Sequence, residues 1–382
     1  MSNRWVQAIA APLAAAIVSL AVASIVLLIS GHDPLEAYKA MWSYVDSTES
    51  VVAILNRAGP YYVSALAAAI GFKMGLVNIG VDGQYRLAAL FAATLGAAVS
   101  LPAVLHVGFI ILVAITVGAL YAGLAGVLKV GRGVNEVIST IMLNYIATGT
   151  IAFLLTRYFK EESEGVGITK TPDIDRSGWM PDLNRTLEAV GFHLPAGTRL
   201  YGYLVVAALL GVGFYVLVWR TRFGFELRSS GINPFAARAS GVSPGRMVIV
   251  TMLISGALAG MVAIGPLLSD THMFEASGGQ FPLALGFTGI GVALLGRNHP
   301  VGIALAAIVY AGIERSTQVL SPLGIPSEIS RILQGTLILS SVIAYEVVRR
   351  QGEAAAVRAA SRGQDHVPTP EPLVGHTGGA TL

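Results

Sequence analysis

Polar side chains within apolar stretches are the residues of this sequence best suited to chemistry. Asn78, Asp82 and Gln84 lie in or directly after Gly71–Gly83, which holds four glycines in thirteen residues. Ionisable and amide groups in lipid are costly unless they are paired, so they are candidates for function. Irregular backbone at membrane depth is tolerated where protein buries it or where it lines a cavity. The stretch therefore predicts the lining of a solute path. A cytoplasmic turn is the alternative, because basic residues flank it.

A second polar group lies near the start of a later apolar segment. Asn135 and Ser139 are four residues apart, which places them on one face of a helix, and Asn144 follows further along. Amide groups both donate and accept hydrogen bonds, so these residues are candidates to contact a polar solute. Hydrogen bonding between neighbouring helices is the alternative for all three.

A third group surrounds another glycine-rich interruption. Phe281, Phe287 and Thr288 lie within it, and Glu314 with Gln318 forms one face of the next apolar segment. Phe287 is a candidate to stack on a planar solute, or it contacts lipid or the protein core. Glu314 either faces a cavity or bonds to a neighbouring helix.

Several kinds of chemistry have no matching pattern. The sequence has no G-x-x-x-x-G-K-[ST] motif, no H-E-x-x-H motif and no cysteine. One G-x-S-x-G match, 241–245, precedes an apolar segment, and we interpret Ser243 as a helix N-cap followed by Pro244. We therefore predict a protein that is not an enzyme and holds no metal. The net charge of +3 comes from scattered basic residues, so nucleic-acid binding is not predicted either.

The composition indicates what positions these residues. Of 382 residues, 54 % are apolar and only 12 % are charged, against about 25 % in soluble domains. A bilayer core of about 30 Å needs roughly 20 apolar residues per helix. The sequence predicts an all-α polytopic membrane protein with about ten transmembrane segments. They are Val6–Ile29, Val51–Phe72, Tyr85–Leu101, Ala103–Leu128, Val134–Leu155, Leu200–Trp219, Met247–Leu268, Pro282–Leu295, Val301–Leu320 and Ile329–Val348.

Basic residues orient these segments, because Lys and Arg concentrate in cytoplasmic loops. Most Lys and Arg residues lie on the cytoplasmic side of the membrane if both termini are cytoplasmic. We therefore predict a multi-pass protein of a bacterial cytoplasmic membrane with both termini in the cytoplasm. Segments two to five and seven to ten suggest an inverted repeat. The predicted parts are a first helix and outer loop (1–50), a first half (51–156), an extracytoplasmic cap or flexible loop (157–199), a second half (200–348) and a disordered cytoplasmic tail (349–382).

The cytoplasmic loop 220–246 contains a short predicted helix. Asn233-Pro234 is a helix start and Gly241 is a stop. A helix of about seven residues is unstable alone in water, so it must pack on something. Phe225 and Phe235 are apolar residues that could insert into a groove of a partner protein. The alternative is a basic loop lying on anionic lipid.

This loop resembles the cytoplasmic coupling loop of ABC importer permeases of the branched-chain amino acid, ribose and nucleoside type. The coupling residues this implies are Gly224, Arg228, Gly231, Asn233, Pro234, Ala236, Ala237, Arg238 and Gly241. The stretches Val77–Gln84, Val134–Tyr145 and Val292–Pro300 are similar to the same family. The Asn-Ile-Gly form of the first stretch, with Gly83-Gln84 after it, looks most like the larger permease chain of nucleoside importers. Asp82 departs from the Glu usual in the family.

The resemblance implies a permease subunit of an ATP-driven importer. ATP and Mg would bind a partner ATP-binding cassette subunit, so this chain has no cofactor of its own. A second permease chain, different or identical, an extracytoplasmic substrate-binding protein and membrane lipid are the other implied partners. The substrate would be a nucleoside, whose hydroxyls and base edges suit amides and whose base suits aromatic stacking. The predicted pathway residues are Asn78, Asp82, Gln84, Asn135, Ser139, Asn144, Phe287, Thr288 and Glu314.

Two other functions remain open at the level of sequence. One is an ABC permease for simple sugars, which share this scaffold. The other is an ion-coupled secondary transporter, which needs acids in its core; Asp82 and Glu314 are the plausible ones.

Overall fold

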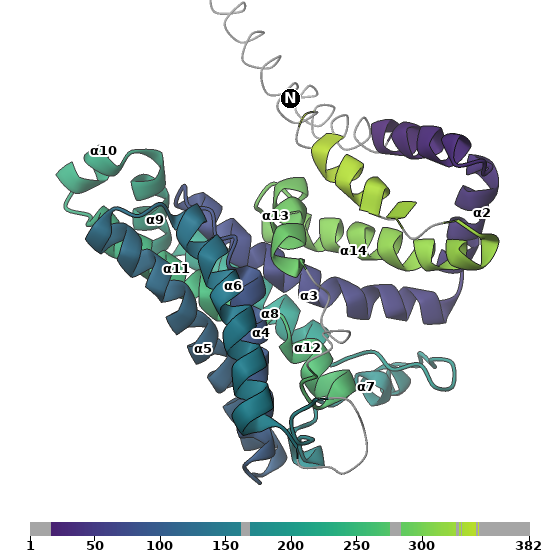
Figure 1. The fold of residues 1–382 in the computed structure, drawn as a ribbon, viewed down its shortest axis with the longest axis horizontal. Coiled ribbons are helices and arrows are strands. Elements are labelled where there is room, and N and C mark those ends of the chain that lie inside the picture. The colour runs from purple at the N-terminus through teal and green to yellow at the C-terminus, as the bar shows by residue number, and fades with distance from the viewer. Residues whose placement is uncertain are drawn as a thin grey trace, which may run out of the picture.

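The computed structural model describes residues 17–161, 169–275, 284–325, 328–329, 331–340 and 343. The predicted tail, 349–382, and Phe281 lie outside them. All regular elements in the described part are helices, apart from two isolated β-bridges. The predicted all-α class is therefore confirmed (Figure 1).

Five helical stretches are long and apolar enough to cross a membrane, counted over the described residues. They are Ala103–Arg132 (α5), Glu136–Phe159 (α6 with a π-helical end), Tyr203–Arg220 (α8), Pro244–Thr271 and Pro300–Leu323. The stretch Pro244–Thr271 consists of α11 (Pro244–Gly260), α12 (Ile264–Pro266) and the π-helix η3 (Leu267–Thr271). The stretch Pro300–Leu323 consists of α14 (Pro300–Ser316) and the 3₁₀ helix η4 (Thr317–Leu323). Two shorter apolar helices are Ile17–Ile29 and α13, Leu285–Leu295. The remaining helices in the body are more polar or shorter.

Two of these remaining helices form the centre of the molecule. α3, Thr48–Lys73, packs against α8, α11, α13 and α14, and α4, Val81–Ala97, packs against α5, α6 and α11. Most of α3 beyond its first turns is buried. A helix enclosed by other helices can carry polar side chains that pair inside the protein, which is why α3 has less apolar character than its neighbours.

The closest helix crossing joins α5 and α11. Gly256 and Gly260 of α11 face Gly118 and Ala114 of α5. A Cβ added to Gly256 would lie 2.2 Å from the Gly118 carbonyl oxygen, so the two backbones touch. Small residues four apart allow this approach, and in lipid such packing replaces the hydrophobic effect as the force between helices.

Two helices of more than ten residues in the described part were not expected from the sequence. α2, Pro34–Val45, lies in the predicted outer loop, and α9, Arg222–Ile232, occupies the first part of the loop 220–246. Both begin at a capping side chain, Asp33 for α2 and Thr221 for α9. These caps are ordinary N-terminal signals, but both helices lie in segments that the sequence analysis interpreted as loops between apolar runs of membrane-spanning length.

The described part of the predicted outer stretch 157–199 is a folded cap. Its helix α7, Asn184–Ala189, lies at the opposite end of the molecule from α10, Pro234–Ala239 (Figure 1). His106 of α5 is fully buried beneath the cap, with one ring nitrogen 2.8 Å from the Ser177 hydroxyl and the other 2.9 Å from the Gly96 carbonyl oxygen. The Ser177 contact joins the cap to α5, and the Gly96 contact joins α5 to α4.

Candidate functional site

A central pocket of about 570 Å³ lies between α3, α13, α14 and the helical residues 331–340. Three residues that the sequence predicted for the pathway, Phe287, Thr288 and Glu314, lie together in its wall. Its full lining is Tyr61, Ala284, Phe287, Thr288, Tyr310, Glu314, Thr317, Gln318, Ser321, Arg331, Gln334, Gly335 and Ile338. The pocket thus joins segments far apart in sequence.

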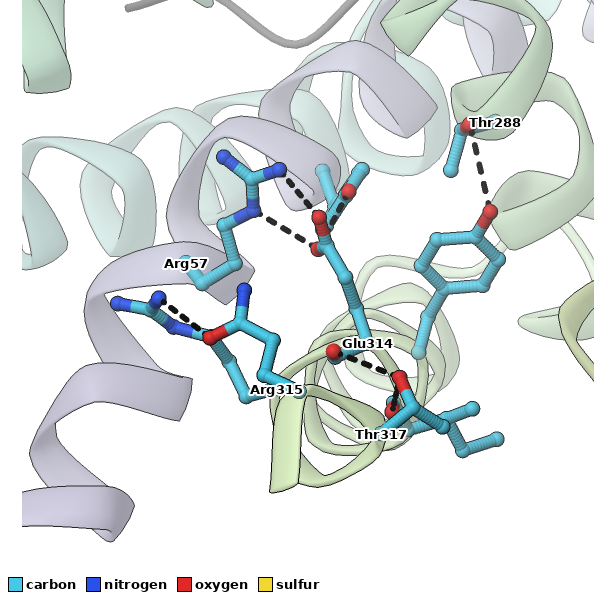
Figure 2. A network of polar contacts seen from close by, with 9 residues as sticks. Arg57, Thr288, Glu314, Arg315 and Thr317 are labelled. Atoms are coloured by element: carbon cyan, nitrogen blue, oxygen red, sulfur yellow. Dashed lines mark hydrogen bonds and ion pairs between the residues drawn. The ribbon is translucent and has the colours of Figure 1, made fainter. Parts of the chain in front are cut away.

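An ion pair between α3 and α14 forms one side of this pocket (Figure 2). Arg57 Nε donates to Glu314 Oε2 at 2.8 Å, and its Nη2 pairs with Oε1, so the contact is bidentate. Tyr61 Oη donates to the same Oε2 at 2.6 Å. Both charged side chains are about three-quarters buried. A bidentate Arg–carboxylate pair is the strongest form of this contact. The Tyr61 hydroxyl is a third donor, so the hydrogen-bonding capacity of the Glu314 carboxylate is well satisfied.

Arg57 is not among the pathway residues predicted from the sequence. The signal that could have found it is its place inside α3, nine residues after the first. A charge that far into a buried helix needs a partner. The sequence could not say that Glu314 is that partner.

Aromatic rings line the pocket beside the ion pair. The Tyr61 and Tyr310 rings meet edge to face, with centroids 4.9 Å apart, and the Arg57 guanidinium lies 5.4 Å from the Tyr61 centroid. Gln334 is 8 % exposed, and its Nε2 has no hydrogen-bond partner in the described structure. A carboxylate, an unpaired amide and ring faces in one pocket suit a polar solute that also has a flat apolar face.

A second pocket, of about 380 Å³, lies on the other side of the ion pair. Arg57 lines this outer pocket, whereas Glu314 and Tyr61 line the central one. The outer pocket is lined by Glu49, Val52, Ala53, Asn56, Arg57, Pro60, Gly197, Thr198, Arg199, Tyr201, Pro266, Asp270 and Arg315. Its walls therefore come from α3, the cap, α14 and the end of the α11 stretch.

Two other predicted residues form a buried network between α4 and α11. Asn78 Nδ2 donates to Gln84 Oε1 at 2.9 Å and lies 2.8 Å from the Ser255 hydroxyl oxygen. Gln84 Nε2 returns a hydrogen bond to Asn78 Oδ1 at 3.0 Å. Ser255 donates to the Ala67 carbonyl oxygen of α3. This network ties three helices together, and a role of its members in the pathway stays a prediction.

Asn144 and Asp82 each connect a helix to the backbone of another segment. Asn144 Oδ1 accepts from the Gly83 N–H at 2.8 Å, and its Nδ2 donates to the Ile79 carbonyl oxygen at 2.9 Å. Asp82 Oδ1 accepts from the Gly286 N–H at 3.2 Å. Asp82 therefore joins the start of α4 to the start of α13, which borders the central pocket.

Asn135 and Ser139 lie at the start of α6, Glu136–Leu154. Asn135 Oδ1 accepts from the Val137 N–H at 2.8 Å, and the Ser139 hydroxyl donates to the Asn135 carbonyl oxygen. Beside them, Lys129 Nζ lies 2.5 Å from Glu136 Oε2 and links the end of α5 to α6. Asn135 caps the helix, and contact with a solute remains a prediction for both residues.

The residues predicted to couple to an ATPase form two short helices, α9 and α10. Arg228 Nη1 donates to the Val218 carbonyl oxygen of α8, and Gly231 lies against the end of α3, where a Cβ would be 2.6 Å from the Lys73 carbonyl oxygen. Gly224 packs on α8, where a Cβ would be 2.2 Å from the Val218 carbonyl oxygen. These contacts fix α9 to the bundle.

α10 projects from this support. Asn233 Oδ1 accepts from the N–H groups of Phe235 and Ala236 at 3.0 Å, Pro234 begins the helix, and Gly241 follows it with φ +81°. Ala237 is buried and Arg238 is exposed. The side chain of Phe235 is 82 % exposed, and that of Ile232, just before α10, is 86 % exposed. The short helix predicted from Asn233-Pro234 and Gly241 is confirmed, and the apolar side chains of Phe235 and of the adjacent Ile232 are exposed.

No group of three or more metal-ligating side chains occurs among the residues that the structure describes. The described pockets contain no set of donors typical of a resident metal ion.

Comparison with known proteins agrees with this architecture. Residues 50–342 match the family described as "Branched-chain amino acid transport system / permease component". The guanosine ABC transporter permease protein NupP of Bacillus subtilis is 32 % identical over 344 residues, which are 88 % of this chain and 93 % of NupP. The nucleoside ABC transporter permease protein NupB of Lactococcus lactis is 28 % identical over 94 % of this chain and 97 % of NupB.

A sugar permease is similar to a comparable degree. The glucose ABC transporter permease protein TsgB13 of Haloferax volcanii is 31 % identical over 331 residues, covering 86 % of this chain and 85 % of TsgB13. The match to the family model covers well over half of the chain. The chain therefore belongs to the branched-chain amino acid transport system permease family.

Proposed function

We propose that this chain is the permease subunit of an ATP-driven importer for nucleosides. The observation that carries the substrate class is the central pocket, where Tyr61, Phe287 and Tyr310 lie with Glu314 and Gln334. Aromatic rings can stack on a base, while the carboxylate and amide can bond ribose hydroxyls. The similarity to guanosine and nucleoside permeases over most of the chain supports the same substrate class.

The membrane arrangement we propose has ten spans with both termini in the cytoplasm. The five long apolar helices would be joined by Ile17–Ile29, α3, α4 and α13, and by the apolar segment 329–348 predicted from the sequence, of which residues 330, 341–342 and 344–348 lie outside the described part. The basic residues of α9 and α10 support a cytoplasmic position for that end, and the cap would then be extracytoplasmic. An inverted repeat of segments two to five and seven to ten remains part of this proposal.

We propose that α10 docks on a separate ATP-binding subunit, which holds ATP and Mg. The exposed side chains of Phe235, on α10, and of Ile232, at the end of α9, support this, since apolar anchors of that kind fill grooves in partner proteins. An extracytoplasmic binding protein would deliver the solute. The largely exposed apolar faces of α5, α6 and α8 leave room for lipid and a second permease chain.

Glucose or a related sugar is the second candidate substrate, because TsgB13 is almost as similar as NupP. The two candidates differ in one respect that the pocket could recognise. A nucleoside has a planar base to place against aromatic rings, whereas a sugar has mainly hydroxyls and weaker apolar faces. Replacement of Phe287 by Ala should therefore impair nucleoside uptake more than sugar uptake.

The test is uptake of labelled guanosine and glucose by cells that express the chain with its partners and lack other importers. ATP-dependent accumulation of guanosine but not glucose would support the proposal, and the reverse result would favour the sugar permease. A chain that purifies alone and moves solute in vesicles without ATP would contradict an ABC permease. Asp82 and Glu314 would then be candidates for ion coupling.

The docking role has its own test, with a matched control. Phe235→Asp places a charge on α10 and should reduce recovery of the ATPase subunit at least tenfold in mild-detergent purification. Phe192→Asp makes the same change at an exposed phenylalanine of the cap, 67 % exposed, and should leave recovery unchanged. Equal recovery from both variants would contradict docking through α10.

A further inference from the structure

We propose that the Arg57–Glu314 pair is a gate between the outer pocket and the central pocket, opened by replacing Arg57 at the carboxylate with solute hydroxyls. The inference rests on the proposed function, because it assumes that solute passes between these pockets. Arg57 lines the outer pocket and Glu314 lines the central one, and the bidentate contact joins them across the boundary.

The register of the two helices supports this division. On α3, Arg57 faces the outer pocket and Tyr61, one turn later, faces the central pocket. On α14, Glu314 lines the central pocket and the adjacent Arg315 lines the outer one. The boundary therefore follows the line on which Arg57 and Glu314 meet; Figure 2 shows the contact between these two side chains. A solute moving from one pocket to the other along this line must separate the pair.

The pair lies in the half of the molecule away from α10. Arg57 is about 14 Å along α3 from Thr48, at 1.5 Å per residue, and Glu314 is about 21 Å along α14 from Pro300. The far ends of the same helices, near Lys73 and Pro300, lie beside α8 and α9. A gate in this position would close the pathway on the cap side.

Both partners lie beside an irregularity in their helix. Pro60 is inside α3, between Arg57 and Tyr61, and removes one backbone hydrogen bond there. α14 ends at Ser316, two residues after Glu314, and continues as the 3₁₀ helix η4. Such interruptions allow helix segments to move relative to each other. The ion pair is therefore held by two segments that can separate without unfolding a regular helix.

Separating the pair without new partners would be unfavourable, since it leaves two charges in a low-dielectric interior. The pockets supply replacements on both sides. Glu49 and Asp270 line the outer pocket with Arg57 and offer it carboxylates. Glu314 keeps the Tyr61 hydroxyl and can accept hydrogen bonds from vicinal hydroxyls of a solute. Opening is then favoured when a hydroxylated solute is present.

The chain has no cysteine, so single introduced thiols can report access without background. Thr288→Cys places a thiol in the central pocket, and Thr198→Cys places one in the outer pocket. Each is treated from the cap side with a membrane-impermeant cationic methanethiosulfonate, in the otherwise unchanged chain and together with Glu314→Gln or Arg57→Ala. We expect both changes to accelerate labelling at position 288 at least tenfold and to leave position 198 unchanged.

A charge exchange separates a gate from a general loss of structure. Arg57→Glu with Glu314→Arg restores opposite charges at the boundary, so slow labelling at position 288 should return, whereas each single reversal should leave it fast. Equal labelling of position 288 with and without the intact pair would overturn the proposal, and so would faster labelling at both positions alike. Glu314→Gln keeps the size of the side chain, so it remains informative if Arg57→Ala fails to fold.

Labelling requires neither ATP nor a transported solute, so its result is independent of the substrate assignment. If position 288 behaves as expected but guanosine is not accumulated, the gate stands and the nucleoside proposal fails. If guanosine is accumulated but the labelling rate at position 288 is the same with and without the Arg57–Glu314 pair, the importer proposal is supported and the gate proposal is contradicted. In Thr288→Cys with the Arg57–Glu314 pair intact, addition of guanosine should accelerate labelling at position 288 by a few-fold.

Discussion

The crossing of α5 and α11 gives a prediction whose size can be worked from the structure. In Gly256→Ala, the new Cβ would lie 2.2 Å from the Gly118 oxygen and 2.4 Å from the Ala122 Cβ. Carbon atoms pack at about 3.5–4.0 Å, so the helices would have to separate by about 1 Å or more. Overpacking of this kind costs roughly 1–3 kcal/mol, against a helix-propensity gain of at most about 1 kcal/mol for Gly to Ala.

The matched control is Gly213→Ala on α8, where no atom lies within 4 Å of the added Cβ. The same chemical change there gains helix propensity without a clash, so its stability should stay equal or rise slightly. The assay is the temperature at which half of the purified chain is lost from its monodisperse peak after heating in detergent. We expect Gly256→Ala to lower this midpoint by several degrees and Gly213→Ala not to lower it. Equal midpoints for the two variants would refute the reasoning that backbone contact at this crossing stabilises the bundle.

Three further changes test other contacts. Asn144→Leu leaves two backbone groups of the 79–83 stretch without their side-chain partner, which costs about 1–3 kcal/mol for each group that is buried. The same heating assay should therefore show a lower midpoint. An unchanged midpoint would mean that water replaces the amide. His106→Phe removes both contacts beneath the cap, so limited proteolysis should cut the cap at least several-fold faster while the helix bundle stays resistant. Lys129→Met leaves the Glu136 carboxylate mostly buried and unpaired, and the additional change Glu136→Gln should recover the lost stability; no recovery would argue against the ion pair as the cause.

Local sequence signals were sufficient to predict that this is a helical membrane protein and to predict the position of α10. Apolar runs of membrane-spanning length predicted α5, α6, α8 and α14 close to their observed positions, because bilayer thickness sets helix length. Asn233-Pro234 and Gly241 predicted α10, since a cap, a proline at the first position and a left-handed glycine act within one turn of the chain. The same kind of signal, Asp33 before Pro34, was available for α2 but lay in a segment interpreted as loop.

The candidate site was predicted only in part. Phe287, Thr288 and Glu314 were singled out because polar and aromatic residues beside glycine-rich or apolar stretches are unusual in lipid, and the structure gathers them in one pocket. The residues of the 78–84 stretch satisfied the same criterion, yet their side chains bond to neighbouring helices and backbone. Sequence alone does not distinguish a polar group that lines a cavity from one that joins helices, because both are costly in lipid and both are paired.

The apolar lengths, caps and turn residues of this sequence are enough to predict a bundle of membrane helices and the short helix α10, because these signals act locally. The contacts of Arg57 with Glu314, 257 residues away, and of Asn78 with Ser255, 177 residues away, are seen in the tertiary structure alone. Such pairs depend on how each helix is rotated and how closely neighbours approach. Those quantities arise from the packing of the whole bundle, including the glycine contact of α5 with α11, and no short stretch of sequence contains them.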